Sequence, residues 1–145
     1  MTSGHIPAHL ARQVRRRADE LCEYCRLPQA SQEATFHVDH TKPKAVGGAT
    51  KFGNLALACV SCSLRKGARE HARDPESGKL VPLFDPRRHR WFDHFAWTRS
   101  MRLRGKTSSG RATVLALRMN RGAVIVIRQQ LCLLGYFPPD PAAEM

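Results

Sequence analysis

The segment FHVDHTKPKAVGGATKFGNLALAC, residues 36–59, lies between two cysteine pairs. The run from Ala34 to His40 predicts a short strand, which the Lys42-Pro43 step ends because the proline has no N–H to donate to a sheet. A glycine-containing loop follows and ends at Asn54. The next stretch, SLRKGAREHAR over residues 63–73, predicts a helix of about two or three turns. Strand, loop and helix are therefore expected in this order.

On either side of this segment the cysteines have equal spacing. Cys22 and Cys25 form CEYC, Cys59 and Cys62 form CVSC, and 33 residues separate the two pairs. Four thiolates in two such turns are what a closed, tetrahedral structural zinc site requires. The alternatives are four unconnected buried cysteines or a redox CxxC, and nothing around either pair indicates a thioredoxin-like unit. The fifth cysteine, Cys132, is expected to be a small buried hydrophobic residue.

An adjacent carboxylate and imidazole, Asp39 and His40, stand at the end of the predicted strand. A hard divalent ion needs oxygen ligands, which Asp39 offers, and an attacking water needs a base that titrates near neutrality, which His40 offers. In a strongly basic protein these groups are ingredients of phosphodiester hydrolysis. Alone they are a weak signal, because Asp-His pairs are common.

The complete order is more specific: CxxC, HxDHxxP, a Gly-Gly loop, NLxLxCxxC, then xxxKG. Over Leu21 to His71 this pattern closely resembles the HNH endonuclease family. The resemblance implies an α+β ββα-metal fold, in which a two-stranded hairpin and a helix hold one catalytic divalent ion and a four-cysteine zinc site braces the module. The later segment LFDPRRHRWFDHFAW, followed by GRATVLALRMNR, also resembles a C-terminal extension found in a bacterial subgroup of these proteins.

Carried over by position, the resemblance makes Asp39 a ligand of the catalytic ion and His40 the general base. Asn54 would orient the loop and, through it, the histidine. Most members have His or Asn as a further ligand after the last cysteine, whereas this chain has Ser63. A serine hydroxyl is a legitimate but weaker ligand that favours Mg²⁺ or Mn²⁺. His37 is either a substitute ligand or neighbour of the site, or a strand histidine that packs near the cysteines.

The whole chain is predicted to divide into three regions: a basic helix in 1–20, the module in 21–73 and an aromatic, arginine-rich and mostly helical extension in 74–145. The first contains an amphipathic pattern over Pro7–Leu21. In the extension, Trp91, Phe95 and Trp97 should pack against the module or one another. Ser109 can cap one helix, and a last helix is expected over Gly122–Leu134.

Charge points to the partner. The chain has 24 Lys and Arg against 12 Asp and Glu, a net charge of +12. This excess indicates a phosphate-rich partner, with DNA ahead of RNA and of an anionic membrane. Because no apolar run reaches about 20 residues and no signal-peptide layout is present, we expect a cytosolic protein. Arg65 and Lys66 follow the second cysteine pair closely enough to contact a phosphate, or they form a solvated helix face. The other candidate backbone contacts are the arginine-rich face of the first helix and Arg87, Arg88 and Arg90.

Together these features favour a metal-dependent HNH endonuclease that hydrolyses DNA. The alternative is a zinc-stabilised nucleic-acid-binding module whose catalysis is weakened, because Ser63 replaces a stronger ligand. A zinc protein that only mediates protein contacts would explain neither the charge nor the combination of Asp39, His40 and Asn54.

Overall fold

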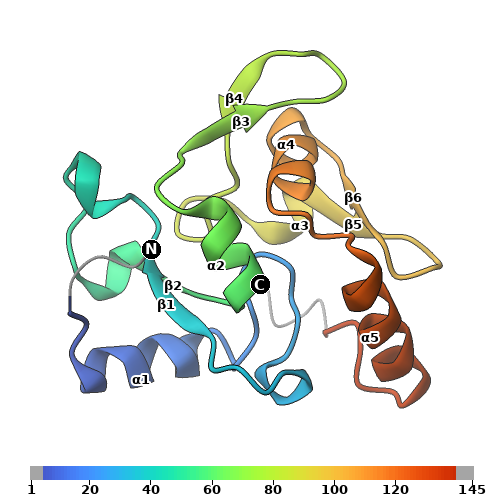
Figure 1. Cartoon of the computed structure of the whole chain (residues 1–145), viewed down its shortest axis with the longest axis horizontal. Helices are drawn as coiled ribbons and strands as arrows, with labels where there is room; N and C mark the ends of the chain where they lie inside the picture. The colour runs from blue at the N-terminus through green and yellow to red at the C-terminus, as the bar shows by residue number, and fades with distance from the viewer. Residues whose placement is uncertain (1–4, 140–145) are drawn as a thin grey trace. The chain divides into compact units, whose positions relative to one another are not determined.

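The computed structural model describes residues 5–139 (Figure 1). It consists of short helices and two-stranded antiparallel sheets, which confirms the predicted α+β class. The chain divides into two compact units. The N-terminal unit contains the described residues up to Glu70 together with Asp85–Arg88, and the C-terminal unit contains His71–Phe84 and the residues from His89 onward. Within residues 5–139, no helix has both the length and the apolar character that crossing a membrane requires.

The N-terminal unit begins with helix α1 (Ala8–Arg17), which packs against the hairpin of the same unit. Its apolar side buries Val14 completely, and its last turn is basic. The predicted helix extended to Leu21, but the backbone turns earlier because Asp19 and Glu20 adopt left-handed conformations, with φ of 56° and 58°. Such residues do not continue a right-handed helix.

The hairpin consists of strands β1 (His37–His40) and β2 (Leu55–Ala58). They pair antiparallel, with His37 opposite Ala58 and His40 opposite Leu55. All four residues of β2 are buried, as expected for an apolar strand that is covered on both faces. Helix α2 (Val60–Lys66) starts two residues after β2 and contacts both strands, so the three elements make a ββα unit (Figure 1).

The helix predicted over residues 63–73 is wrong beyond Lys66. Gly67 follows α2 with φ of 52°, a left-handed conformation that glycine adopts without a Cβ clash, and the helix ends there. His71–Arg73 form strand β3 instead, paired antiparallel with β4 (Leu80–Pro82). The turn-forming residues 74–78 connect these two strands.

The C-terminal unit combines two hairpins with three helices. The second hairpin joins β5 (Phe95–Trp97) and β6 (Leu103–Gly105). The helices are α3 (Trp91–His94), α4 (Ser108–Ala116) and α5 (Gly122–Leu133). Helix α4 packs against β6, β3, β4 and α3. The last helix was predicted within one residue, whereas both hairpins were not predicted.

The N-terminal cap of α4 differs from the prediction. Thr107 is the capping residue, and its Oγ1 accepts a hydrogen bond of 3.0 Å from the backbone N–H of Gly110. The expected cap, Ser109, lies inside the first turn. Threonine and serine both cap well, so the choice between neighbouring hydroxyls depends on where the strand before the helix ends.

An aromatic cluster forms the core of the C-terminal unit. Trp91 is 2% exposed, and its ring centroid lies 5.0 Å from that of Phe95 and 5.4 Å from that of Trp97. Phe84 meets Phe95 edge to face at 5.2 Å. The prediction that Trp91, Phe95 and Trp97 pack against one another is thus confirmed, and tilted or edge-on pairs of this kind stabilise beyond their buried area.

Helix α5 carries an unexpected polar residue into this core. Arg128 is fully buried, and its guanidinium donates to the backbone oxygens of Met119 (2.6 Å) and Met101 (3.2 Å). These bonds satisfy carbonyls that would otherwise be lost from water. Cys132 on the same helix is exposed, so the prediction that it is a buried hydrophobic residue is wrong. The helix turns Arg128 inward and Cys132 outward.

Candidate functional site

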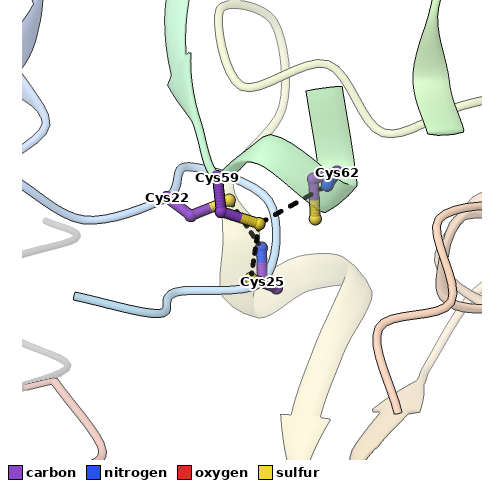
Figure 2. Close-up of side chains that lie close together, drawn as sticks. All are labelled: Cys22, Cys25, Cys59 and Cys62. Atoms are coloured by element: carbon purple, nitrogen blue, oxygen red, sulfur yellow. Dashed lines mark hydrogen bonds between the residues drawn. The ribbon is translucent and has the colours of Figure 1, made fainter. Parts of the chain in front are cut away.

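Four buried cysteines converge at one end of the ββα unit (Figure 2). Cys22 and Cys25 lie in the turn after α1, whereas Cys59 and Cys62 lie at the start of α2. All four Sγ atoms lie within 4.8 Å of one another. The predicted four-cysteine cluster is therefore present and is positioned to bind one metal ion.

Sulfur geometry favours an ion over a disulfide. The Sγ atoms of Cys25 and Cys59 are 3.7 Å apart, far beyond a covalent S–S bond of about 2 Å. A tetrahedral ion with metal–sulfur bonds of about 2.3 Å would separate its ligands by about 3.8 Å. The backbone N–H of Cys25 donates to Cys22 Sγ, and that of Cys62 to Cys59 Sγ, both at 3.4 Å. Such bonds stabilise negative charge on sulfur.

The pKa values of the four thiols are shifted in opposite directions within the cluster. Burial raises the pKa of the Cys22 thiol. Hydrogen bonds from the neighbouring thiols lower the pKa of Cys59. Four buried thiolates repel one another, so a bound cation is what allows all four to ionise together.

Directly after this cluster, α2 presents Ser63 to strand β1. Ser63 is buried, and its Oγ lies 2.8 Å from Nδ1 of His37 in a hydrogen bond. The structure thus brings together the two residues whose roles the sequence left most open. His37 does not simply pack beside the cysteines, because its ring nitrogen meets the hydroxyl that follows Cys62.

Asp39 lies two residues after His37, so their side chains leave the strand on the same face. Its Oδ1 is buried and has no hydrogen-bond partner among the described residues. A buried carboxylate oxygen without a partner is unfavourable unless a cation or a donor completes it. Asp39 offers an oxygen on the strand face that also carries His37, the hydrogen-bond partner of Ser63, and oxygen donors of this kind suit Mg²⁺ or Mn²⁺.

His40 ends β1, and its imidazole is held by the loop. Nε2 lies 2.7 Å from Oγ1 of Thr50. Burial lowers the pKa of His40, and the positive charges of Lys44 and Lys66 lower it further, against the opposing effect of Asp39. A lowered pKa leaves the imidazole neutral at physiological pH, which is the state a general base requires. Sequence reasoning missed Thr50, because no spacing pattern distinguishes it from other loop threonines.

The side chain of Asn54 makes four hydrogen bonds to the loop between β1 and β2. Its Oδ1 accepts from Thr41 Oγ1 (2.8 Å) and from the N–H of Lys42 (2.9 Å). Its Nδ2 donates to the carbonyls of Lys42 (3.1 Å) and Ala49 (2.9 Å). The amide therefore fixes both sides of the loop that carries Thr50, the partner of His40.

Comparison with known families matches residues 22–69 to HNH endonuclease. The four cysteines, the hairpin and α2 all lie within this match. Residues 22–69 are therefore similar to the HNH endonuclease family and form an HNH-like module. The match concerns about a third of the chain. No match was found among curated proteins or among solved structures.

Within this HNH-like module, residues 22–69, Lys66 is not a surface cation. It is 5% exposed, and its Nζ lies 3.4 Å from the carbonyl oxygen of Thr41. Burial lowers its pKa, while the negative charge of Asp39 opposes that effect. The predicted phosphate contact thus lies inside the unit, close enough to Asp39 and His40 to act on both electrostatically.

The other predicted DNA contacts divide into exposed and occupied residues. Arg87 forms an ion pair with Glu23, whose second oxygen accepts from the N–H of Leu57 at 2.9 Å. Arg65 and Arg88 are exposed on the N-terminal unit, and Arg90 is exposed on the C-terminal unit. Arg87 is thus engaged in holding the cysteine turn to β2.

A pocket of about 340 Å³ opens beside Asn54 on the N-terminal unit. Backbone at Gly47 and Gly48 forms part of its wall. Lys42, Lys51 and Arg88 bring positive charge to it, which the carboxylate of Asp85, 3.9 Å from Arg88, balances only in part. Gly48 is required there, because a Cβ would lie 1.8 Å from the carbonyl oxygen of Lys42. A cationic pocket next to the loop that holds His40 suits an anionic substrate.

Proposed function

We propose that this chain is a metal-dependent endonuclease that hydrolyses phosphodiester bonds in DNA. The observation that carries the proposal is the buried, unpartnered Oδ1 of Asp39 on the strand that ends with His40, in a segment similar to the HNH family. A divalent ion, Mg²⁺ or Mn²⁺, would be held by Asp39 with Ser63 or His37. When bound, it would stabilise the negative charge that builds on the phosphate.

The chain's own residues supply the proton transfer. When the hydroxyl of Thr50 accepts from Nε2–H of His40, the second ring nitrogen, Nδ1, carries the free lone pair. Nδ1 would then take a proton from the attacking water as the new O–P bond forms. On the opposite side of the phosphorus the P–O bond to the 3′ oxygen would break, and the departing oxygen would take a proton from water, leaving a 5′ phosphate and a 3′ hydroxyl. Asn54 keeps the loop, and through Thr50 the imidazole, in one orientation.

We further propose that the four cysteines hold zinc. Four sulfur ligands with tetrahedral spacing select a soft or borderline ion rather than Mg²⁺. All four cysteines are buried, so the site is closed to water and structural rather than catalytic. Its role is to fix the start of α2, and hence Ser63, relative to the turn that carries Cys22 and Cys25.

Contacts to the DNA backbone are assigned in this proposal to exposed cations. Lys42, Lys51 and Arg88 at the pocket beside Asn54 would take a phosphate next to the scissile one, and Arg65 and Arg90 would add further contacts. Such contacts position DNA without reading its sequence. Residues 1–20 and 74–145 would serve as a basic helix and an extension to this module.

A second function is favoured by one pair of observations. The hydroxyl of Ser63 is engaged by His37, and the buried ammonium of Lys66 already acts on Asp39. Both would weaken binding of a catalytic ion. The competing proposal is therefore a module that binds nucleic acid through the same surface and cleaves slowly or not at all.

Nicking of supercoiled plasmid separates the two. The full chain is incubated with Mg²⁺, Mn²⁺ or Ni²⁺, alongside His40→Ala and the matched control His71→Ala, which removes an exposed histidine outside the family match. The nuclease predicts nicking by the wild type and by His71→Ala, and none by His40→Ala. Plasmid binding without nicking under every metal would favour the binding module, and cleavage of RNA in place of DNA would correct the substrate.

A further inference from the structure

The C-terminal unit has a hollow of its own, outside the family match. It measures about 550 Å³ and lies among β6, α4 and the turn that leads into α5. Its lining includes Arg102, Arg118 and Arg121 together with the apolar side chains of Val114, Leu115 and Pro75. This volume falls in the range of pockets that take small organic ligands.

The charge of the hollow is available to a ligand. Arg102 and Arg118 are exposed, and Arg121 is half-buried. A fourth arginine in the wall, Arg111, is occupied, because its guanidinium binds both oxygens of Asp74 at 2.9 Å. None of the described residues that line the hollow is acidic. The hollow therefore has a net positive charge that no lining carboxylate balances.

Arg118 occupies a position whose backbone conformation favours glycine. It lies just beyond α4 and has φ of 47°, the left-handed conformation that usually ends a helix with glycine. An arginine retains its side chain at this position in spite of backbone strain. A strained residue on the rim of a charged hollow points to a role for its guanidinium.

The turn that carries these arginines is fixed rather than loose. Asn120 accepts from the N–H of Leu103 at 2.7 Å and donates to its carbonyl at 2.8 Å, which ties the turn to β6. Arg121 Nη1 donates to the carbonyl of Arg118 at 3.0 Å. The hollow is thus formed before a ligand arrives, which reduces the entropy lost on binding.

We infer that this hollow binds one nucleotide of a single-stranded nucleic acid. Arg102, Arg118 and Arg121 would hold the phosphate, because guanidinium groups bind phosphate oxygens in pairs. Val114 and Leu115, the latter 59% exposed, would face the base together with a guanidinium plane. A base inside a duplex is stacked on its neighbours, so an unpaired strand is the form that fits a hollow. The inference uses no residue of the proposed nuclease site.

Binding of a short fluorescent oligothymidylate to the full chain tests this inference. All proteins carry His40→Ala so that cleavage does not interfere. Arg118→Gly should weaken binding about tenfold, as expected for one lost charge-assisted contact, while the melting temperature stays level or rises, because glycine suits the left-handed backbone. Leu115→Ser, an exposed substitution, should also weaken binding.

Two control variants make the test specific. Arg104→Gln removes an equal charge from β6 outside the hollow, and Met101→Gly relieves another left-handed residue of the same unit, with φ of 63°. Both should bind oligothymidylate like the parent. The inference is overturned if Arg104→Gln weakens binding as much as Arg118→Gly, or if neither changes it. It is equally overturned if Arg118→Gly loses affinity only for duplex DNA, for anionic lipid vesicles or for an acidic peptide.

Discussion

Different interactions stabilise the two units of this chain. In the N-terminal unit, β1, β2 and α2 are short, and four cysteines from two distant turns converge on one point. In the C-terminal unit, a cluster of aromatic rings and the buried Arg128 occupy the centre. We therefore expect the first unit to depend on a metal ion and the second on side-chain packing.

The two units also differ in whether the residues that stabilise the fold lie next to the candidate functional residues. In the HNH-like module, Ser63 directly follows the last cysteine, so the group that meets His37 is placed by the residue that would bind zinc. In the C-terminal unit, the arginine-lined hollow and the aromatic cluster use different residues. A defect in the cysteine site is therefore expected to affect both the fold and the candidate site, whereas substitutions in the hollow should leave the fold intact.

The largest expected effect is the loss of one cysteine ligand. Cys22→Ser should release the metal and unfold the N-terminal unit, because the binding energy of a structural zinc, about 10–16 kcal/mol, exceeds or matches the stability of a typical domain. Both tryptophans, Trp91 and Trp97, belong to the C-terminal unit, so their fluorescence reports that unit alone. Metal analysis, circular dichroism and tryptophan emission are measured together.

Cys132→Ser is the matched control for that experiment, since Cys132 is exposed on α5 and far from the cysteine cluster in sequence. It should keep the metal and the fold. If Cys22→Ser loses the folded tryptophan signal together with the metal, the two units do not fold independently. The proposed contrast between a metal-dependent unit and a packing-dependent unit would then be wrong.

A core substitution in the C-terminal unit should destabilise that unit and leave the metal bound to the N-terminal unit. Trp91→Ala removes a ring that is 2% exposed and contacts three other aromatic rings. The expected loss is about 3–5 kcal/mol of unfolding free energy in that unit, measured by chemical denaturation with metal content unchanged. Trp91→Phe, which keeps a ring, should lose clearly less. Release of the metal by Trp91→Ala would contradict the proposed division of roles.

A smaller, pH-dependent effect is expected at Asp74. Hydrogen bonds from Arg111 hold the pKa of Asp74 well below its ordinary value, with Ser77 contributing. A carboxyl with a depressed folded pKa stabilises above its unfolded pKa, about 3.9, and loses this contribution as pH falls through the folded pKa. Asp74→Asn should therefore lower the melting temperature at neutral pH, and the difference from wild type should shrink below about pH 4. A difference that is independent of pH would refute this assignment.

The smallest expected effect concerns the orientation of His40. Thr50→Val removes the hydroxyl that lies 2.7 Å from Nε2 and nearly preserves the side-chain volume. If the proposed nuclease acts as described, kcat for plasmid nicking should fall about tenfold with little change in KM, as for other positioning partners. Thr35→Val, at an exposed position before β1, is the control. Equal rates for Thr50→Val and wild type would exclude a positioning role.

Local sequence patterns were sufficient to predict the cysteine cluster, the strand that ends at His40, the loop after it and the presence of a helix after the second cysteine pair. Each CxxC turn presents two sulfurs by local geometry, and an apolar strand followed by a capped helix is also a local pattern. The position of Ser63 next to the cluster followed from the same order. The four converging Sγ atoms confirm the cluster, β1 confirms a strand that ends at His40, and α2 covers only the first part of the predicted helix.

Features that depend on tertiary contacts were not predictable. The helix expected through Arg73 stops at Gly67, where a left-handed backbone overrides local propensity. Strands β3 to β6 have three residues each, too few for a clear alternation. Burial of Lys66 and exposure of Cys132 arise from how their helices turn, and the hydrogen bond between His40 and Thr50 depends on a loop closed by Asn54. None of these features produces a recognisable spacing pattern in the sequence.

The most direct test of the account uses Asp39→Asn, which removes one charge and preserves shape. If Asp39 holds the catalytic ion and the cysteines hold a separate structural one, purified Asp39→Asn should retain about one tightly bound zinc per chain and fail to nick supercoiled plasmid with Mg²⁺ or Mn²⁺. The wild type, measured in parallel, should retain the same zinc and nick the plasmid. Nicking by Asp39→Asn at the wild-type rate would contradict the account.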